Sequence, residues 1–169
     1  IRHILRARKQ PGDVSCLPIG ARRCSMACIY DLVKHQETYR ADVTQTVLEL
    51  AQAMVDRNIG AVPVLRDGEM VGIFSERDLM KRVVVERLDP AVTRIEEVMT
   101  SDPLSVPPNE SIETCMILMR RHGFRHLPIC DGKILKGMVS LRDIMLHDLD
   151  EKDHEMRMMR AYIQASPEI

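Results

Sequence analysis

Two segments of this chain, which lie 65 residues apart, carry nearly the same pattern of residues. The first spans residues 60–78 and the second spans residues 125–143. A repeat of this length predicts two copies of one structural unit, stacked so that each covers the apolar face of the other. The residue pairs that keep the offset are Pro63 and Pro128, Gly72 and Gly137, Ser75 and Ser140, Asp78 and Asp143, Val47 and Ile112, and Met54 and Met119.

Apolar spacing predicts the same order of elements in both copies: strand, helix, strand, strand, helix. A unit of about 60 residues is too small to bury its sheet alone. We therefore expect an α/β (α+β) fold in which two pseudo-symmetric β-α-β-β-α motifs pack sheet to sheet. The predicted elements are 39–43, 47–55, 61–65, 70–74 and 75–85 in the first copy, and 104–106, 112–121, 127–130, 135–139 and a helix from residue 140 in the second.

Local signals refine these boundaries. Gly60 is predicted to end the first long helix in a left-handed conformation. Asp67 and Gly68 form the dipeptide that is typical of a tight hairpin turn. Short helices over 28–35 and 95–99 are predicted to lead into the two copies.

The repeat divides the chain into four parts. Residues 1–27 form a basic extension, with a helix predicted over Ile1–Lys9 and a loop after it. Residues 28–90 hold the first motif and residues 91–148 the second. Residues 149–169 form a charged tail with apolar residues at helical spacing, which we interpret as an added helix and a candidate subunit contact.

Composition excludes several classes of function. The net charge of −1 gives no overall attraction to nucleic acid or to an anionic membrane, although the basic start leaves nucleic-acid binding as a third hypothesis. No apolar run approaches the roughly 20 residues of a membrane-spanning helix. Five cysteines without a CxxC pair indicate reduced thiols and a cytoplasmic protein, with no metal site. No nucleophile elbow, HExxH, P-loop or GxGxxG motif is present, so we predict that the chain is not an enzyme.

The repeated segment Gly-h-h-Ser-x-Arg-Asp, in which h is apolar, suggests a binding site. Ser75 and Ser140 stand at predicted helix starts, where backbone N–H groups favour an anion such as phosphate. Asp78 and Asp143 carry carboxylates that can accept two hydrogen bonds from the cis-diol of a ribose. An alternative reading is purely structural, because Ser-x-x-Asp is also a capping box. The glycine ahead of each segment favours the ligand reading, because it lets a ligand approach the backbone closely.

These segments resemble those of a tandem pair of CBS domains, also called a Bateman module. The resemblance rests on Val62-Pro63-Val64 and Leu127-Pro128-Ile129, on the Asp-Gly turn, and on the segments Gly72–Asp78 and Gly137–Asp143. It covers roughly residues 28–148, and the part before Val43 fits less well than its counterpart before Val106. The resemblance implies a regulatory module that binds an adenosine-containing ligand, with AMP as the first expectation and ADP, ATP, NAD(H) or S-adenosylmethionine as alternatives. It also implies a homodimer, shaped as a flat disc, and a separate protein that is regulated.

The resemblance further implies where the ligand contacts lie. It assigns them to the repeated Ser and Asp residues, to the strand before the first helix of each motif, and to the residues just ahead of the Pro-containing strands. Arg77 and Arg142 are matched cations that either reach phosphate or form surface pairs worth under about 1 kcal/mol. The candidate ligand-binding residues are Asp42, Val43, Ile59, Gly60, Ala61, Ser75, Arg77, Asp78, Val106, Phe124, Arg125, His126, Ser140, Arg142 and Asp143.

Two hypotheses of different classes remain open at this point. The chain is either a sensor of an adenine nucleotide or a dimerisation and adaptor module whose clefts hold no ligand. The residues ahead of the Pro-containing strands differ between the copies, Gly60 and Ala61 against Arg125 and His126. In one interpretation Arg125 is a phosphate contact at the mouth of a cleft. In the other, Arg125 points to solvent and His126 is a half-buried residue of the sheet. We expect two clefts that do not bind alike.

Overall fold

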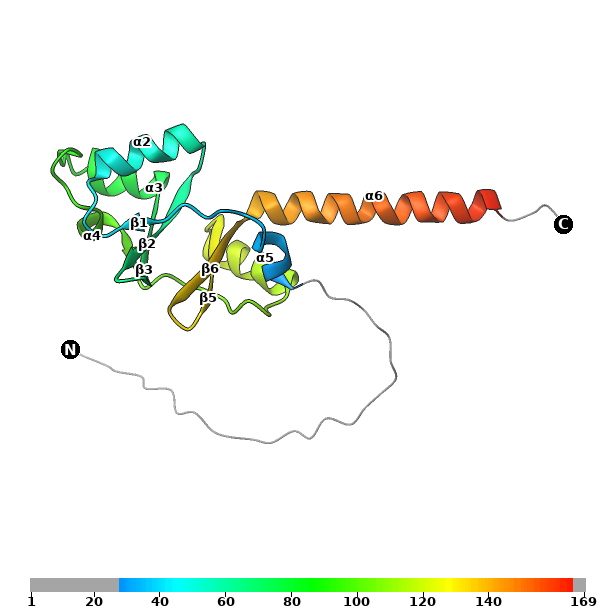
Figure 1. Cartoon of the computed structure of the whole chain (residues 1–169). Helices are drawn as coiled ribbons and strands as arrows, with labels where there is room; N and C mark the ends of the chain where they lie inside the picture. Colours follow the sequence, from blue (N-terminus) through cyan, green and yellow to red (C-terminus); the bar gives the residue numbers. More distant parts are fainter. Residues whose placement is uncertain (1–27, 166–169) are drawn as a thin grey trace, which may run out of the picture.

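A computed structural model describes residues 28–165, so the predictions made for residues 1–27 lie outside the described part. Two small motifs pack together, and one long helix projects from them (Figure 1). The mixed α/β fold with two β-α-β-β-α motifs is as the sequence predicts. Within residues 28–165, no helix is both long enough and apolar enough to cross a membrane.

The first motif forms a four-stranded sheet in the order β1-β2-β3-β4. Strand β1 is parallel to β2, whereas β3 is antiparallel to both β2 and β4. The elements are β1 (Ala41–Asp42), α2 (Val47–Arg57), β2 (Ala61–Arg66), β3 (Glu69–Ser75), α3 (Glu76–Asp78) and the π-helix η1 (Leu79–Val84), with β4 (Thr100–Ser101) added from further along the chain.

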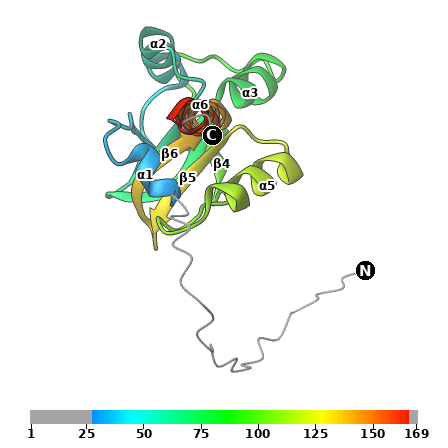
Figure 2. The ribbon, with the colours of Figure 1, turned by 90° about the vertical axis from the view of Figure 1, so that its right-hand side faces the viewer.

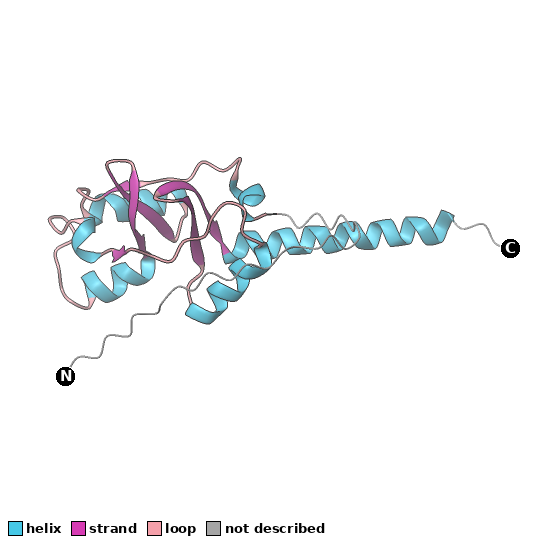
Figure 3. Cartoon of the chain, turned by 90° about the horizontal axis from the view of Figure 1, so that it is seen from below, coloured by secondary structure: helices cyan, strands magenta, loops and turns pink. Residues whose placement is uncertain are grey.

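The second motif repeats this plan with a shorter sheet. Its two strands β5 and β6 are antiparallel, and Val106 adds one parallel bridge to Ile129. The bridge matches the pairing of Ala41 with Val64 in the first motif, because both residues keep the 65-residue offset. The elements are α5 (Ile112–His122), β5 (His126–Asp131), β6 (Ile134–Ser140) and α6 (Leu141–Ala165). The sheets meet where the Met70 N–H of β3 donates to the Lys133 carbonyl, at 2.9 Å. Figure 3 shows helices on the outside of both sheets.

Capping residues explain where the helices begin and end. The Thr46 hydroxyl accepts from the N–H of Glu49, and the Glu49 carboxylate accepts in return from the N–H of Thr46. At the other end of α2, Asn58 adopts the left-handed conformation with φ 52°, so the prediction that Gly60 does so was wrong. Asn can take this conformation because its short polar side chain bonds locally. Its counterpart in α5 is Gly123, with φ 70°.

Two other predicted boundaries differ from the structure. The helix that follows Ser75 keeps α-geometry only over Glu76–Asp78 and continues as a π-helix. The tail after residue 148 is not a separate helix, because α6 runs without a break from Leu141 to Ala165. No Gly or Pro occurs in α6 to interrupt it.

The segments that precede the two motifs are exchanged between them. Helix α1 (Ile29–Val33) precedes the first motif, yet Ile29 and Val33 belong to the core of the second. Helix α4 (Ile95–Val98) precedes the second motif, yet Ile95 belongs to the core of the first. The division at residue 90 therefore separates the repeats along the chain but does not separate the two cores.

The exchange follows the pseudo-symmetry of the repeat. The Ile29 N–H donates to the Glu110 carbonyl at 2.9 Å, and the Ile95 N–H donates to the Gln45 carbonyl at 3.0 Å. Ile29 and Ile95 are 66 residues apart, whereas Gln45 and Glu110 are 65 apart. The chain from the start of the lead-in helix to the start of the first long helix is therefore one residue longer in the first motif than in the second.

The repeated glycines, Gly72 and Gly137, leave room for the exchanged segments to pack closely against the sheets. A Cβ atom on Gly137 would lie 2.7 Å from Cγ2 of Val33, and one on Gly72 would collide with the side chain of Met99. Both glycines are buried, and neither is among the residues that line the two cavities between the motifs described below. Their role as a place of close ligand approach is thus not supported, because it is the exchanged segments that approach them.

Candidate functional site

Two cavities lie between the motifs, and each takes residues from both. The larger, of about 1200 Å³, contains Asp143 and is called the Asp143 cleft. The smaller, of about 470 Å³, contains Asp78 and is called the Asp78 cleft. Residues ahead of the Pro-containing strand of one motif thereby face the Ser and Asp of the other motif.

Most of the predicted site residues line one cavity or the other. Ile59, Ser140, Arg142 and Asp143 line the Asp143 cleft. Ser75, Arg77, Asp78 and Phe124 line the Asp78 cleft. The predicted residues that line both are Gly60, Ala61, Arg125 and His126.

Three predicted residues line neither cavity. Val43 and Val106 are 5% exposed and pack in the first and second cores. Asp42 is exposed, and its carboxylate accepts from the N–H and the hydroxyl of Thr44, at 2.9 and 2.6 Å. These contacts hold the pKa of Asp42 below its ordinary value.

Residues slightly upstream take their place. Thr38 and Tyr39 line the Asp143 cleft, and Pro103 and Leu104 line the Asp78 cleft. These pairs also keep the 65-residue offset, which is the signal that could have found them. The guanidinium of Arg57 lies over the ring of Tyr39, 4.4 Å from the centroid of that ring.

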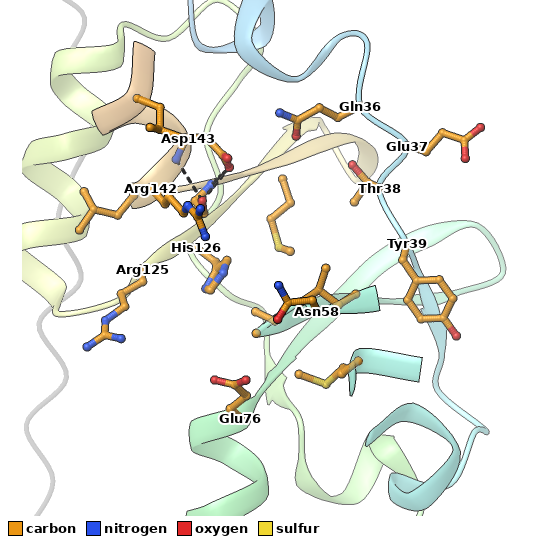
Figure 4. Close-up of a pocket in the computed structure, with 18 of the residues that line it drawn as sticks. Gln36, Glu37, Thr38, Tyr39, Asn58, Glu76, Arg125, His126, Arg142 and Asp143 are labelled. Atoms are coloured by element: carbon orange, nitrogen blue, oxygen red, sulfur yellow. Dashed lines mark hydrogen bonds between the residues drawn. The ribbon is translucent and has the colours of Figure 1, made fainter. Parts of the chain in front are cut away.

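Both Ser-x-x-Asp segments form the predicted capping boxes. One oxygen of Asp143 accepts from the N–H and the hydroxyl of Ser140, at 2.9 and 2.7 Å, and the Asp143 N–H donates back to that hydroxyl (Figure 4). Asp78 and Ser75 make the same three contacts. The carboxylates are thus structural caps first, and a ligand can use only their second oxygens.

The second oxygens differ between the clefts. Oδ1 of Asp78 accepts from the Thr100 hydroxyl at 3.2 Å and lies 3.6 Å from Nε of Arg82. The other oxygen of Asp143 receives no hydrogen bond or ion pair from any residue in the described range 28–165. Of the two capping-box aspartates, Asp143 is therefore the one that offers a carboxylate oxygen whose acceptor capacity no residue in the described range uses.

The expected row of free backbone N–H groups at the helix starts is mostly absent. At the start of α6, the N–H groups of Ser140 and Asp143 serve the capping box, and that of Leu141 donates to the Arg125 carbonyl at 2.8 Å. The Glu76 N–H is used in the same way by the Gly60 carbonyl, at 3.1 Å. An anion would therefore depend mainly on guanidinium groups.

Two such groups are available in the Asp143 cleft. Arg125 and Arg142 are both exposed, and within residues 28–165 neither makes an ion pair. Arg125 also lines the Asp78 cleft, whose other arginine, Arg77, donates to the carbonyl of Gly123 at 3.2 Å. Figure 4 shows Arg125 and Arg142 near Asp143, with Tyr39 on the opposite side of the cleft.

Between the cavities lie His126, which the sequence predicts as a site residue, and the carboxylate of Glu76, which the sequence did not single out. Glu76 lines both cavities, and a Cβ on Gly60 would lie 3.4 Å from its Oε2 and 3.6 Å from Cε1 of His126. Burial lowers the pKa of His126, although the carboxylates of Asp143 and Glu76 oppose the shift and Arg125 adds to it.

This shift predicts a pH dependence of stability. The pKa of His126 in the folded chain lies below its ordinary value of 6.5. The neutral imidazole therefore makes its full contribution to the free energy of unfolding above pH 6.5, and this contribution is lost as the pH falls through the folded pKa. We expect the melting temperature of wild type to fall more steeply between pH 7 and acid pH than that of His126→Gln. Circular dichroism melts at several pH values measure this, with the exposed His154→Gln as control. Parallel curves for wild type and His126→Gln would contradict the prediction.

Comparison with known proteins gives a consistent picture. The sequence model of the CBS domain matches residues 35–85 and 95–150. The CBS domain-containing protein YhcV of Bacillus subtilis is 35% identical over 108 residues, which are 64% of this chain and 76% of YhcV. The mitochondrial CBS domain-containing protein CBSX3 of Arabidopsis thaliana is 31% identical over 70% of this chain, but the match spans only 60% of CBSX3.

Solved structures share the fold as well. A protein with CBS domains from Burkholderia ambifaria superposes with a TM-score of 0.66 at 31% identity, over 70% of this chain and 91% of the other. The CBS domain pair of protein MJ0100, solved with 5′-methylthioadenosine and S-adenosylmethionine, has a TM-score of 0.66 at 21% identity, over 75% of this chain and 98% of the other. The two matched regions, the pseudo-symmetric fold and these relatives together show that the chain belongs to the CBS-domain family, as a tandem pair.

Proposed function

We propose that this chain is a regulatory module that binds an adenine-containing ligand in the Asp143 cleft. The observation that carries the proposal is the second carboxylate oxygen of Asp143, which no residue in the described range uses. A carboxylate that is fixed by a capping box and still open on one side is preorganised to accept hydrogen bonds from a ribose diol.

The surroundings of Asp143 suit the rest of a nucleotide. The guanidinium groups of Arg125 and Arg142 can neutralise a phosphate with a planar pair of donors. Ile59, Tyr39 and Met138 supply apolar surface for a base. MJ0100, which has the same fold, was solved with two adenosine-containing ligands. We retain AMP as the first expectation, with NAD, ATP or S-adenosylmethionine as alternatives.

A ligand of this kind regulates only if it binds one arrangement of the protein more tightly than another. Because the two motifs share both clefts and exchange their lead-in helices, a ligand between them would bias how they pack. We further propose that the signal passes to a separate protein and that the chain acts as a homodimer. The free thiols of Cys28, Cys115 and Cys130 fit the proposed cytoplasmic compartment.

A specific observation also favours the alternative of a ligand-free adaptor. Both Ser and Asp pairs make complete capping boxes, so their presence alone does not require a ligand. In that case the Asp143 cleft would be filled by a partner or a second copy, and the guanidinium groups would lie at a protein contact.

A thermal-shift panel separates the two functions. A ligand present at about 100 times its Kd stabilises the folded state by about 2.7 kcal/mol. For a chain of this size we expect the melting temperature to rise by about 5–10 °C. AMP, ADP, ATP, NAD and S-adenosylmethionine would be compared with GMP at equal concentration, and mass spectrometry would identify any molecule that copurifies. No shift with any adenine compound at millimolar concentration, and no copurifying nucleotide, would overturn the proposal.

A further inference from the structure

Helix α6 extends far beyond the two motifs and carries an apolar stripe along its length. Figures 1 and 3 show its second half standing clear of the rest of the described chain, and Figure 2 looks along its axis, with the motifs gathered around its base. The side chains of the stripe are 51–72% exposed. The stripe consists of Met145, Leu149, Met156, Met159 and Ile163, with Lys152 as its one polar member.

The spacing of this stripe is that of a coiled-coil strand. Its positions alternate steps of four and three residues from 145 to 163, so all six lie on one side of the helix. The opposite side carries Met158, which is equally exposed at 61% but outside the stripe. An exposed stripe of this regularity marks a surface that another helix covers.

Charge indicates that the other helix is a second, antiparallel copy of α6. Residues 148–155 contain five acidic side chains and one lysine, whereas Arg157 and Arg160 make the following turn basic. An antiparallel pair places the acidic segment of each copy opposite the basic turn of the other. A parallel pair in register would stack Lys152 on Lys152 of the second copy and bring acidic segments together, which is unfavourable.

The antiparallel arrangement also has a self-consistent register. With residue 154 at the centre, Met145 faces Ile163 of the second copy, Leu149 faces Met159, and Lys152 faces Met156. Every stripe position then has a stripe position opposite it. The two globular parts lie at opposite ends of the helix pair, so they do not collide.

This register connects the helix pair to the candidate site. Met145 and Leu149 line the Asp143 cleft and are 54% and 61% exposed. We propose that a second copy of this chain pairs antiparallel along α6, and that the end of its helix covers the apolar side of the Asp143 cleft. The Asp143 cleft of one copy is then completed by Met159 and Ile163 of the other. The pairing does not depend on which ligand the cleft takes.

Disulfide trapping tests the pairing and its orientation in the full chain. The double variant Met145→Cys with Ile163→Cys is expected to form covalent dimers under mild oxidation, with a 145–163 linkage between chains identified by peptide mass mapping. A bond within one chain is excluded, because 18 residues of helix separate the two positions by about 27 Å. The control pair Met145→Cys with Met158→Cys is expected to give no such linkage. A dominant 159–159 linkage in the single variant Met159→Cys would show a parallel pair and overturn the proposal, as would the absence of any linkage through α6.

A second arm compares neighbouring methionines in the trapping variant. Met159→Glu places a carboxylate in an apolar layer, so the yield of trapped dimer is expected to fall about tenfold or more. Met158→Glu makes the same change on the opposite face and should leave the yield unchanged. Equal yields for the two would overturn the proposal even if a dimer forms elsewhere on the chain. Because both positions project beyond the motifs, the two variants should melt like wild type.

Discussion

Replacing Asp143 by asparagine is expected to weaken adenine-nucleotide binding by about 10- to 150-fold, because hydrogen bonds to a charged group contribute about 1.5–3 kcal/mol. The amide keeps one acceptor oxygen for the N–H of Ser140, so the cap at the start of α6 survives. Its NH₂ group, however, cannot accept hydrogen bonds from a ribose diol. Isothermal titration calorimetry measures the affinity, and a thermal melt without ligand measures the stability.

The matched control is Asp78→Asn. The second oxygen of Asp78 already serves Thr100 and lies near Arg82, so this change should destabilise the fold while altering nucleotide affinity far less. The asparagine variants are sharper than alanine variants, because alanine would remove a cap worth about 1 kcal/mol as well as any ligand contact. If Asp143→Asn left the affinity unchanged while Asp78→Asn abolished binding, the assignment of the primary cleft would be reversed. If a nucleotide bound and neither variant weakened it, the carboxylates would be caps alone.

Replacing Gly137 by alanine is expected to destabilise the chain by about 1–3 kcal/mol, the usual cost of overpacking a core. The added Cβ would lie 2.7 Å from Cγ2 and 3.1 Å from Cβ of Val33. Rotation about χ1 does not move Cβ of Val33, and a helical valine strongly prefers one χ1 rotamer, so turning Cγ2 away is also unfavourable. Denaturant unfolding followed by circular dichroism measures the change.

Two further variants make this prediction specific. Gly60→Ala adds a Cβ whose nearest neighbour, Oε2 of Glu76, is 3.4 Å away, so stability should change by less than about 1 kcal/mol. Val33→Ala removes the colliding atom, and in a double variant with Gly137→Ala it should recover part of the lost stability. Additive losses in the double variant would mean that α1 does not pack against Gly137, and the exchange of lead-in segments would be wrong.

The sequence alone determined the number of motifs, their order of elements and the residues at the helix starts. It did so because these features are local: apolar periodicity sets strands and helices, and Ser-x-x-Asp sets a cap. Tyr39 and Leu104 line equivalent places in the two clefts and keep the 65-residue offset, so the repeat contains a signal for them that the list of candidate residues left out. Local signals also failed in places: Asn58 and not Gly60 is the left-handed residue, and the helix after Asp78 continues as a π-helix.

The tertiary structure decided what depends on contacts between distant residues. Ile29 and Ile95 each pack in the motif that they do not precede, and no periodicity encodes which of two similar cores receives an apolar helix. In the same way, the capping segments of Asp78 and Asp143 are nearly equivalent in sequence, but Thr100 and Arg82 approach only Asp78. The repeat therefore predicts two clefts, each with one Ser-x-x-Asp capping segment. Their inequality arises from side chains that the fold brings to one carboxylate and not to the other, because hydrogen bonds form between neighbours in space.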